Sequence, residues 1–367
     1  MGLRSSVLPL ISALSVLPMV AACGGADAPA GEALTTAEPQ NQNVQKPPVD
    51  DASSPLPADA APEPPAGDPE ANTLIIYAIP APSSTLNPGG LSWSSPGDLV
   101  RGTLLNEAGG LALNFTRTIG HVAITVKCAA TANAPEAHYQ SGMTNRDSDD
   151  FNDLVLKQQI GFGMLFDNVP GELETEARVQ QTIDERKQSG LMRFVRFQIA
   201  EDVCRGLLGY AAAYQAENVQ KNYGLEARPL YKEGAGCSAY GMSYLQLANL
   251  LEPRFVQGWS FSVRVPMWSK PLHQPLIGGT KNPRVRVPIQ RLAALSQPWA
   301  APDEEGIDLF GWDPTRMYKW LDARTTEALA DGSEKVESMG NARGLVLDRR
   351  TVAPTAPLKN RTYFNVP

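Results

Sequence analysis

The chain is poor in histidine, cysteine and basic residues, and each shortage excludes a class of binding site or partner. It contains three histidines and four cysteines in 367 residues. Their spacings fit no zinc-binding template, so no metal is expected, and no cofactor motif is present. The 32 Lys and Arg residues are fewer than the 39 Asp and Glu residues and form no basic stripe. We therefore expect no nucleic-acid partner, and the sequence does not indicate the oligomeric state.

Long apolar runs are also missing, apart from one at the N-terminus. There, Arg4 precedes the uncharged run Val7–Val20, which ends in Val-Ala-Ala-Cys23 followed by Gly24. The run is too short for a membrane span and has the length of a signal-peptide core. The end of the run resembles a bacterial lipobox. This resemblance implies a signal peptide over residues 1–22, a lipid on Cys23 that anchors the chain to a membrane, and an outer-membrane location facing the periplasm. An ordinary secretory cleavage site is the alternative.

The composition changes at residue 73. Residues 23–72 are rich in Pro, Ala and acidic residues and contain no aromatic side chain, which predicts a disordered tether. All six tryptophans follow it, and we expect one domain with a C-terminal extension over residues 73–367. Patterning predicts strands at 73–79, 98–105, 120–128, 136–142, 193–199, 259–268 and 282–289, and helices at 172–190, 201–220, 238–251 and 312–330. Because strands and helices alternate irregularly, the predicted class is α+β.

The cysteine count points to one unpaired thiol. If Cys23 carries lipid, three cysteines remain in an oxidising compartment: Cys128, Cys204 and Cys237. Cys128 ends a predicted strand and Cys204 begins a predicted helix, so these two are the candidate disulfide. Cys237 would then be free.

Cys237 lies in "EGAGCSAYGMSYLQLANLL", between a glycine-rich turn and an apolar helix. The unpaired N–H groups and the dipole of a helix N-terminus stabilise a thiolate and lower its pKa. This position suits a nucleophile, although a buried structural cysteine is the alternative interpretation.

A thiolate nucleophile requires a base, and His121 is the candidate because it opens the apolar strand "HVAITVKC". His138, in the predicted hairpin partner, is the candidate that orients the His121 ring. Gln140 lies on the same strand face as His138 and is the rival candidate. A structural role is the alternative for both histidines, and His273 lies in a Pro-rich loop.

The stretch "GHVAITV" resembles the histidine strand of the NlpC-like cell-wall peptidases of the papain-like superfamily. The order here is His121, His138, then Cys237, which is the order of the circularly permuted branch that includes the lecithin:retinol acyltransferase-like enzymes. The resemblance covers roughly Leu91–Leu251, with inserted sequence after Gly142. It implies a permuted papain-like fold, in which an antiparallel sheet packs on the cysteine-bearing helix.

The resemblance also implies acyl transfer. His121 would deprotonate Cys237, the sulfur would attack an amide carbonyl, and a backbone N–H of Cys237 or Ser238 would hold the oxyanion. The expected protein is thus an exported lipoprotein with a cysteine amidase or peptidase domain acting in peptidoglycan. A lipid-ester acyltransferase or lipase of the same fold and a non-catalytic envelope-binding module are the alternatives. An apolar groove beside Cys237 would favour the lipid ester, and a polar one would favour peptidoglycan.

Overall fold

The computed structural model describes residues 72–82, 91–113, 119–147, 150 and 153–364. The predicted signal peptide, the predicted lipidation site Cys23 and the predicted tether up to residue 71 lie outside the described residues. Asn72, the last residue assigned to the tether, is instead the first residue of strand β1 (Asn72–Ile79). Among the helices of the described part, none has the length and apolar character needed to cross a membrane.

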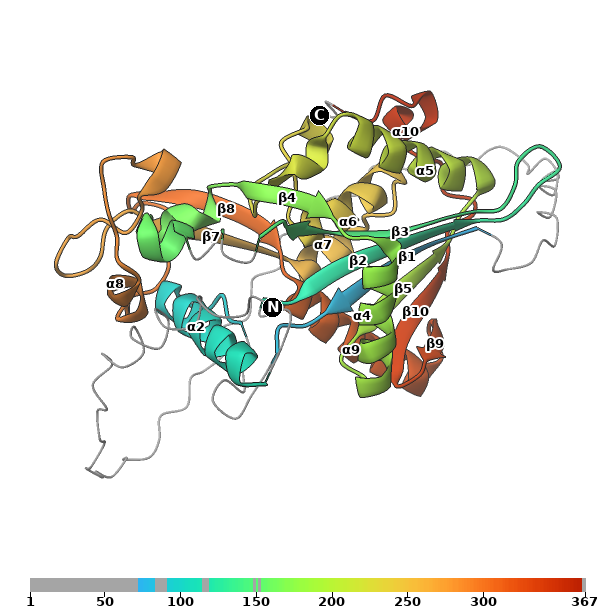
Figure 1. The fold of residues 1–367 in the computed structure, drawn as a ribbon. Coiled ribbons are helices and arrows are strands. Elements are labelled where there is room, and N and C mark those ends of the chain that lie inside the picture. The colour runs from blue at the N-terminus through green and yellow to red at the C-terminus, as the bar shows by residue number, and fades with distance from the viewer. Residues whose placement is uncertain (1–71, 83–90, 114–118, 148–149, 151–152, 365–367) are drawn as a thin grey trace, which may run out of the picture. The chain divides into compact units, whose positions relative to one another are not determined.

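A mixed eight-stranded sheet forms the centre of the structure (Figure 1). Its strands run in the order β6-β4-β3-β2-β1-β5-β10-β9. Every neighbouring pair is antiparallel except β5 and β10, which are parallel, so the expectation of a purely antiparallel sheet is wrong in this one place. The strands are β2 (His121–Cys128), β3 (Ala137–Asn145), β4 (Val169–Leu173), β5 (Arg193–Gln198), β6 (Asn222–Tyr223), β9 (Lys335–Met339) and β10 (Ala342–Asp348).

Strand β1 lies in the middle of the sheet because nearly every residue in it is apolar. It pairs with β2 on one side and β5 on the other, and its residues from Thr73 to Ile79 are buried. A strand covered on both faces is expected to read as a continuous hydrophobic run rather than an alternating one. Leu74 and Ile76 face one core cluster, and Ile75 and Tyr77 face another.

Helices cover both faces of the sheet (Figure 1). Helices α5 (Glu201–Ala216), α6 (Cys237–Leu247) and α9 (Pro314–Asp331) contribute to the larger core together with α7 (Pro253–Trp259). On the opposite face, α4 (Glu176–Ser189) covers the smaller core with Val179 and Ile183. Helix α6, which carries Cys237, packs directly on β2 and β3, as the sequence predicts for the cysteine-bearing helix.

A separate hairpin, β7 (Ser260–Pro266) with β8 (Gly306–Trp312), packs with α2 (Pro96–Leu113) and α8 (Ile289–Ala293) around another apolar cluster. Helix α2 corrects the predicted strand at residues 98–105, and residues 282–289 form no strand beyond an isolated bridge at Val287. The remaining short elements are α10 (Ala356–Asn360) and the helical turns η1 (Asp153–Lys157), η2 (Phe162–Leu165), η3 (Val219–Lys221), η4 (Pro229–Tyr231) and η5 (Gly279–Lys281).

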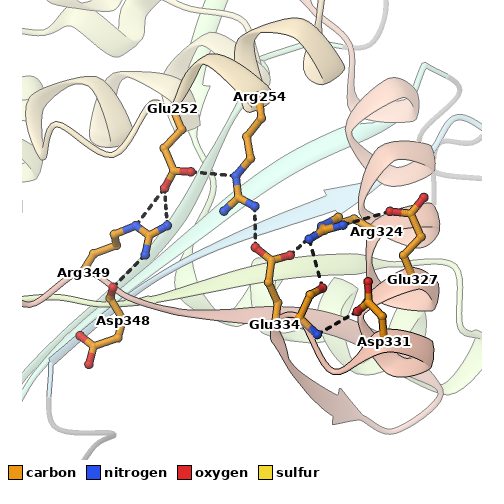
Figure 2. Close-up of polar contacts among 9 residues, drawn as sticks. Glu252, Arg254, Arg324, Glu327, Asp331, Glu334, Asp348 and Arg349 are labelled. Carbon is orange, nitrogen blue, oxygen red and sulfur yellow. Dashed lines mark hydrogen bonds and ion pairs between the residues drawn. The ribbon is translucent and has the colours of Figure 1, made fainter.

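A chain of alternating charges joins the C-terminal elements to α7 (Figure 2). Arg349 after β10 pairs with Glu252, which also binds Arg254 of α7. Arg254 reaches Glu334 before β9, and Arg324 of α9 binds the same carboxylate. Burial raises the pKa of Glu334, but hydrogen bonds from both arginines outweigh burial and leave it below its ordinary value. The network therefore fixes β9, β10 and α9 against α7.

A disulfide joins Cys128 at the end of β2 to Cys204 in α5, with a Cα–Cα distance of 5.8 Å, and Cys237 is free. Both findings match the pairing expected from the sequence. The bridge closes a loop between residues separated by 76 positions, and long loops gain most from closure in the chain-entropy account.

We predict that the double substitution Cys128→Ser with Cys204→Ser lowers the free energy of unfolding by about 2–4 kcal/mol. Urea unfolding followed by circular dichroism measures the loss. Wild-type protein kept in reductant is the matched control and should unfold at the same urea concentration as the double variant. An oxidised wild type that unfolds together with the double variant would contradict the prediction.

Candidate active site

His121 is the first residue of β2 and pairs with Ile79 of β1. The preceding Gly120 has φ +83°, and a Cβ there would lie 2.9 Å from the Ile79 carbonyl oxygen. Only glycine fits this tight approach without strain. The turn therefore delivers the imidazole to the end of the strand, where it is 3% exposed.

Cys237 is the first residue of α6, and Gly236 is the residue that caps the helix. Upstream, Gly234 has φ +105°, and a Cβ there would lie 2.2 Å from the Asn222 carbonyl oxygen. The glycine turn thus passes closely over β6 before the helix begins. The thiol is placed at the helix N-terminus as the sequence predicts, and the residue is 6% exposed.

The His121 side chain hydrogen-bonds to the Cys237 sulfur, and the Val122 backbone N–H bonds to the same atom. Burial alone raises the pKa of the Cys237 thiol. The hydrogen bond and charge of His121, with smaller contributions from Val122 and Ser238, outweigh burial and hold the pKa below its ordinary value. The structure therefore brings together the two residues that the sequence nominates as nucleophile and base.

Glu174 occupies the far side of the imidazole. Its Oε2 lies 2.6 Å from Nε2 of His121, and its side chain is 0% exposed. Because Nε2 faces this carboxylate, Nδ1 is the ring nitrogen left to face the sulfur. The backbone of Glu174 is fixed as well, since its N–H donates to the Gly142 carbonyl at 2.8 Å and its carbonyl accepts from the Ser141 hydroxyl at 3.0 Å. The imidazole therefore contacts both the sulfur and the carboxylate.

Gly142 of β3 leaves room for this arrangement. A Cβ at Gly142 would lie 2.5 Å from Oε2 of Glu174 and 2.8 Å from Nε2 of His121, closer than real Cβ contacts. The histidine and the carboxylate thus meet directly over the backbone of β3. A larger residue at position 142 must displace at least one of these two side-chain ends.

Arg178 of α4 contacts the other oxygen of the carboxylate, with its Nε 3.4 Å from Oε1 of Glu174. A fully buried carboxylate is costly unless it is paired, because the low-dielectric interior does not solvate its charge. Arg178 and His121 pair the two oxygens of Glu174. Arg178 itself is more than half exposed, so it connects the buried carboxylate to the surface.

The two residues proposed to orient His121 lie elsewhere. Nδ1 of His138 is 3.0 Å from Oε1 of Glu176, and the side chain is 38% exposed. His138 pairs with Lys127, far along β2 from His121. Gln140 donates through its Nε2 to the Thr125 hydroxyl at 3.0 Å. Of the described residues, it is Glu174 that contacts the imidazole nitrogen away from the sulfur.

Ser238, the second residue of α6, is buried, and its hydroxyl lies 3.9 Å from the Cys237 sulfur. Its backbone N–H belongs to the first helical turn, whose N–H groups have no partner within the helix. This N–H and that of Cys237 lie at the start of the helix that carries the sulfur, and the oxyanion contact expected of them stays a prediction.

Tyrosines support α6 from within the core. The hydroxyl of Tyr240 is 2.9 Å from those of Tyr139 and Tyr244, and Tyr210 donates to Ser243 at 2.9 Å. Burial raises the pKa of Tyr240 and Tyr244, so both are neutral. This hydrogen-bonded set holds the helix, and with it Cys237, against β3.

A hollow of about 510 Å³ is lined in part by Glu233, which precedes Cys237 in the chain by four residues. We call this hollow the polar groove. It is lined by Phe166, Asn168, Glu226, Ala227, Arg228 and Glu233. Among the described residues, no group of three or more His, Cys, Asp or Glu side chains is arranged to hold a metal ion.

Comparisons with protein-family models, with curated proteins and with solved structures find no match to this chain.

We predict that Gly142→Ala slows the alkylation of Cys237 by iodoacetamide at pH 7 by about tenfold or more, the loss expected if the thiol pKa rises by one unit. The added methyl group pushes Glu174 from His121 and weakens the imidazolium that stabilises the thiolate. Peptide mass spectrometry measures the rate at Cys237.

Leu329→Ala is the control, because Leu329 is a 58% exposed residue of α9. It should leave the alkylation rate unchanged. Equal rates for Gly142→Ala and the wild type would show that the His121–Glu174 contact does not influence the thiol.

Proposed function

We propose that this chain is a cysteine hydrolase that cleaves or transfers an acyl group held in an amide bond. The observation that carries the proposal is the position of His121 between the sulfur of free Cys237 and the buried carboxylate of Glu174. Nucleophile, base and orienting group in hydrogen-bond contact are the requirements for nucleophilic catalysis at a carbonyl.

The reaction follows from this geometry. The Cys237 thiolate attacks the amide carbonyl carbon, and the new oxyanion receives hydrogen bonds from the N–H groups of Cys237 or Ser238. The C–N bond then breaks, and protonated His121 gives its proton to the leaving amine. A thioester remains on the sulfur. Water, deprotonated by His121, hydrolyses the thioester and restores the thiol; an acceptor amine or alcohol in place of water completes a transfer.

Glu174 keeps the imidazole in the productive orientation and stabilises its charged form in each step. Because the carboxylate is fully buried, its interaction with the imidazolium is weakly screened. This role is the one that the sequence assigns to His138 or Gln140, now given to a residue on the segment between β4 and α4.

The α+β architecture, the histidine at a strand start and the cysteine at a helix start all support a permuted papain-like fold as part of the proposal. The mixed sheet, with its parallel β5–β10 pair and the β7–β8 hairpin, adds elements beyond the core that the resemblance implies.

An exported lipoprotein anchored by Cys23 in the outer membrane and facing the periplasm remains the proposed setting. The Cys128–Cys204 disulfide supports an oxidising compartment. Peptidoglycan is then the proposed source of the amide. The polar groove favours such a substrate over a lipid ester, since four of its six lining residues are charged or amide side chains.

We predict that the mature protein releases soluble fragments with new amino groups from peptidoglycan sacculi, as detected by mass spectrometry. Cys237→Ser abolishes release. Glu174→Gln lowers kcat by about 10²–10⁴-fold, the range expected when general acid–base catalysis is impaired. An acyl-thioester on Cys237, trapped at low pH, identifies the intermediate.

His138→Gln is the matched control, because His138 is a solvent-facing histidine of the same sheet, and it should retain activity within about twofold. Fatty-acid release from phospholipid vesicles in place of sacculus cleavage would support the lipid-ester alternative. Absence of any thioester or product with either substrate would support the binding module.

A further inference from the structure

The polar groove has the dimensions of a ligand site and is lined by Glu233, four residues before the candidate nucleophile. Its volume of about 510 Å³ falls in the range typical of small-molecule pockets. Phe166 and Ala227 are buried and give it an apolar floor, while Asn168, Glu226 and Arg228 are exposed along its walls.

The groove is connected to Cys237 by a short, tightly packed turn. Glu233 lies four residues before Cys237, a span of at most about 14 Å even if fully extended. Within that turn, a Cβ on Gly236 would lie 3.2 Å from the Gly224 carbonyl oxygen. The segment from Gly224 to Glu226 therefore runs beside the turn.

Two glutamates of the lining, Glu226 and Glu233, each form an ion pair with a basic residue. Glu226 Oε2 lies 3.3 Å from Nζ of Lys281, whose ammonium is 5.2 Å from the centre of the Phe166 ring. Arg228 binds Glu233 through Nε at 2.8 Å and through Nη2, and its guanidinium lies 4.3 Å from the centre of the Tyr231 ring. No described residue pairs with Nη1 of Arg228, and none hydrogen-bonds to the Asn168 amide.

The lining carries two carboxylates, Glu226 and Glu233, and one guanidinium, Arg228, and Lys281 beside Glu226 balances the second carboxylate. A simple anion would meet the carboxylates of Glu226 and Glu233, and a simple cation would meet Arg228 and Lys281. A ligand with one charge of each sign can pair with both kinds of group. The existing pairs are exposed and contribute little stability, so a ligand can replace them at low cost.

We infer that the polar groove binds a zwitterionic peptide end, with its carboxylate on Arg228 and its ammonium on Glu226. The Asn168 amide then hydrogen-bonds to the peptide backbone, and Phe166 and Ala227 contact a small apolar side chain. This inference rests on the proposed function, because it names the part of the substrate that the groove holds while Cys237 attacks the amide.

The test measures binding of dialanine to the mature Cys237→Ser variant by calorimetry, so turnover plays no part and the result is independent of catalysis. Dialanine with free ends should bind, and both N-acetyl-dialanine and dialanine amide should bind about tenfold more weakly, the change expected from loss of one charge pair. Arg228→Gln should weaken dialanine binding and remove the preference over the amide. Glu226→Gln should remove the preference over the acetylated form.

Arg350→Gln is the matched control, since Arg350 forms an exposed pair with Asp348 away from the groove. It should leave all three affinities unchanged. The inference is overturned if dialanine does not bind, if the three ligands bind equally, or if Arg228→Gln and Glu226→Gln bind as the control does. Activity on sacculi with unselective dialanine binding would overturn the inference and leave the proposed function intact.

Discussion

The contact between the buried carboxylate of Glu174 and the imidazole of His121 is the constraint on which the site depends. A carboxylate with no solvent exposure is tolerated only where its oxygens are paired, and here His121 and Arg178 pair them. The contact in turn requires a glycine at position 142. Removing one partner from a buried pair is costly, so these residues form one unit whose members cannot vary independently.

The sheet explains how residues far apart in the chain reach this unit. β1 is buried on both faces and holds β2, whose first residue is His121. β3 pairs with β2 and supplies Gly142, and β4 pairs with β3 and leads into Glu174. Helix α6 packs on β2 and β3 and presents Cys237 at its N-terminus. His121, Glu174 and Cys237 thus each lie at or beside the end of a regular element, where side chains are positioned without distorting the core.

Much of this organisation can be predicted from the sequence. The apolar run of β1, the strand beginning at His121 and the glycine turn before Cys237 are local signals, and cysteine parity points to the Cys128–Cys204 bridge. Helix α2 is missed because "DLVRGTLL" is a short apolar run that fits a strand or a helix. A local signal for the helix does exist: the Ser95 hydroxyl accepts from the Asp98 N–H at 3.1 Å, and Pro96 begins the helix.

Glu174 could not be found in the same way. The pattern from Glu172 predicts one surface helix, in which Glu174 is one glutamate among several. Its burial results from pairing of β4 with β3 and from the space above Gly142, and both depend on contacts between distant segments. The sequence pattern therefore points to the hairpin that carries His138 as the source of the orienting residue. In the structure, His138 faces Glu176 and solvent.

The central claim is that His121 activates Cys237, and the pH dependence of Cys237 alkylation tests it most directly. A lowered pKa means that the thiolate is already present at lower pH, so the iodoacetamide rate should reach half its plateau below the value of about 8.5 for a free thiol. The midpoint does not depend on how easily the reagent enters, because access changes only the plateau. In His121→Ala the midpoint should move up to about 8.5 or above, since only the smaller contributions of Val122 and Ser238 then oppose burial. A wild-type midpoint at or above that value, or one that His121→Ala leaves in place, would contradict the account.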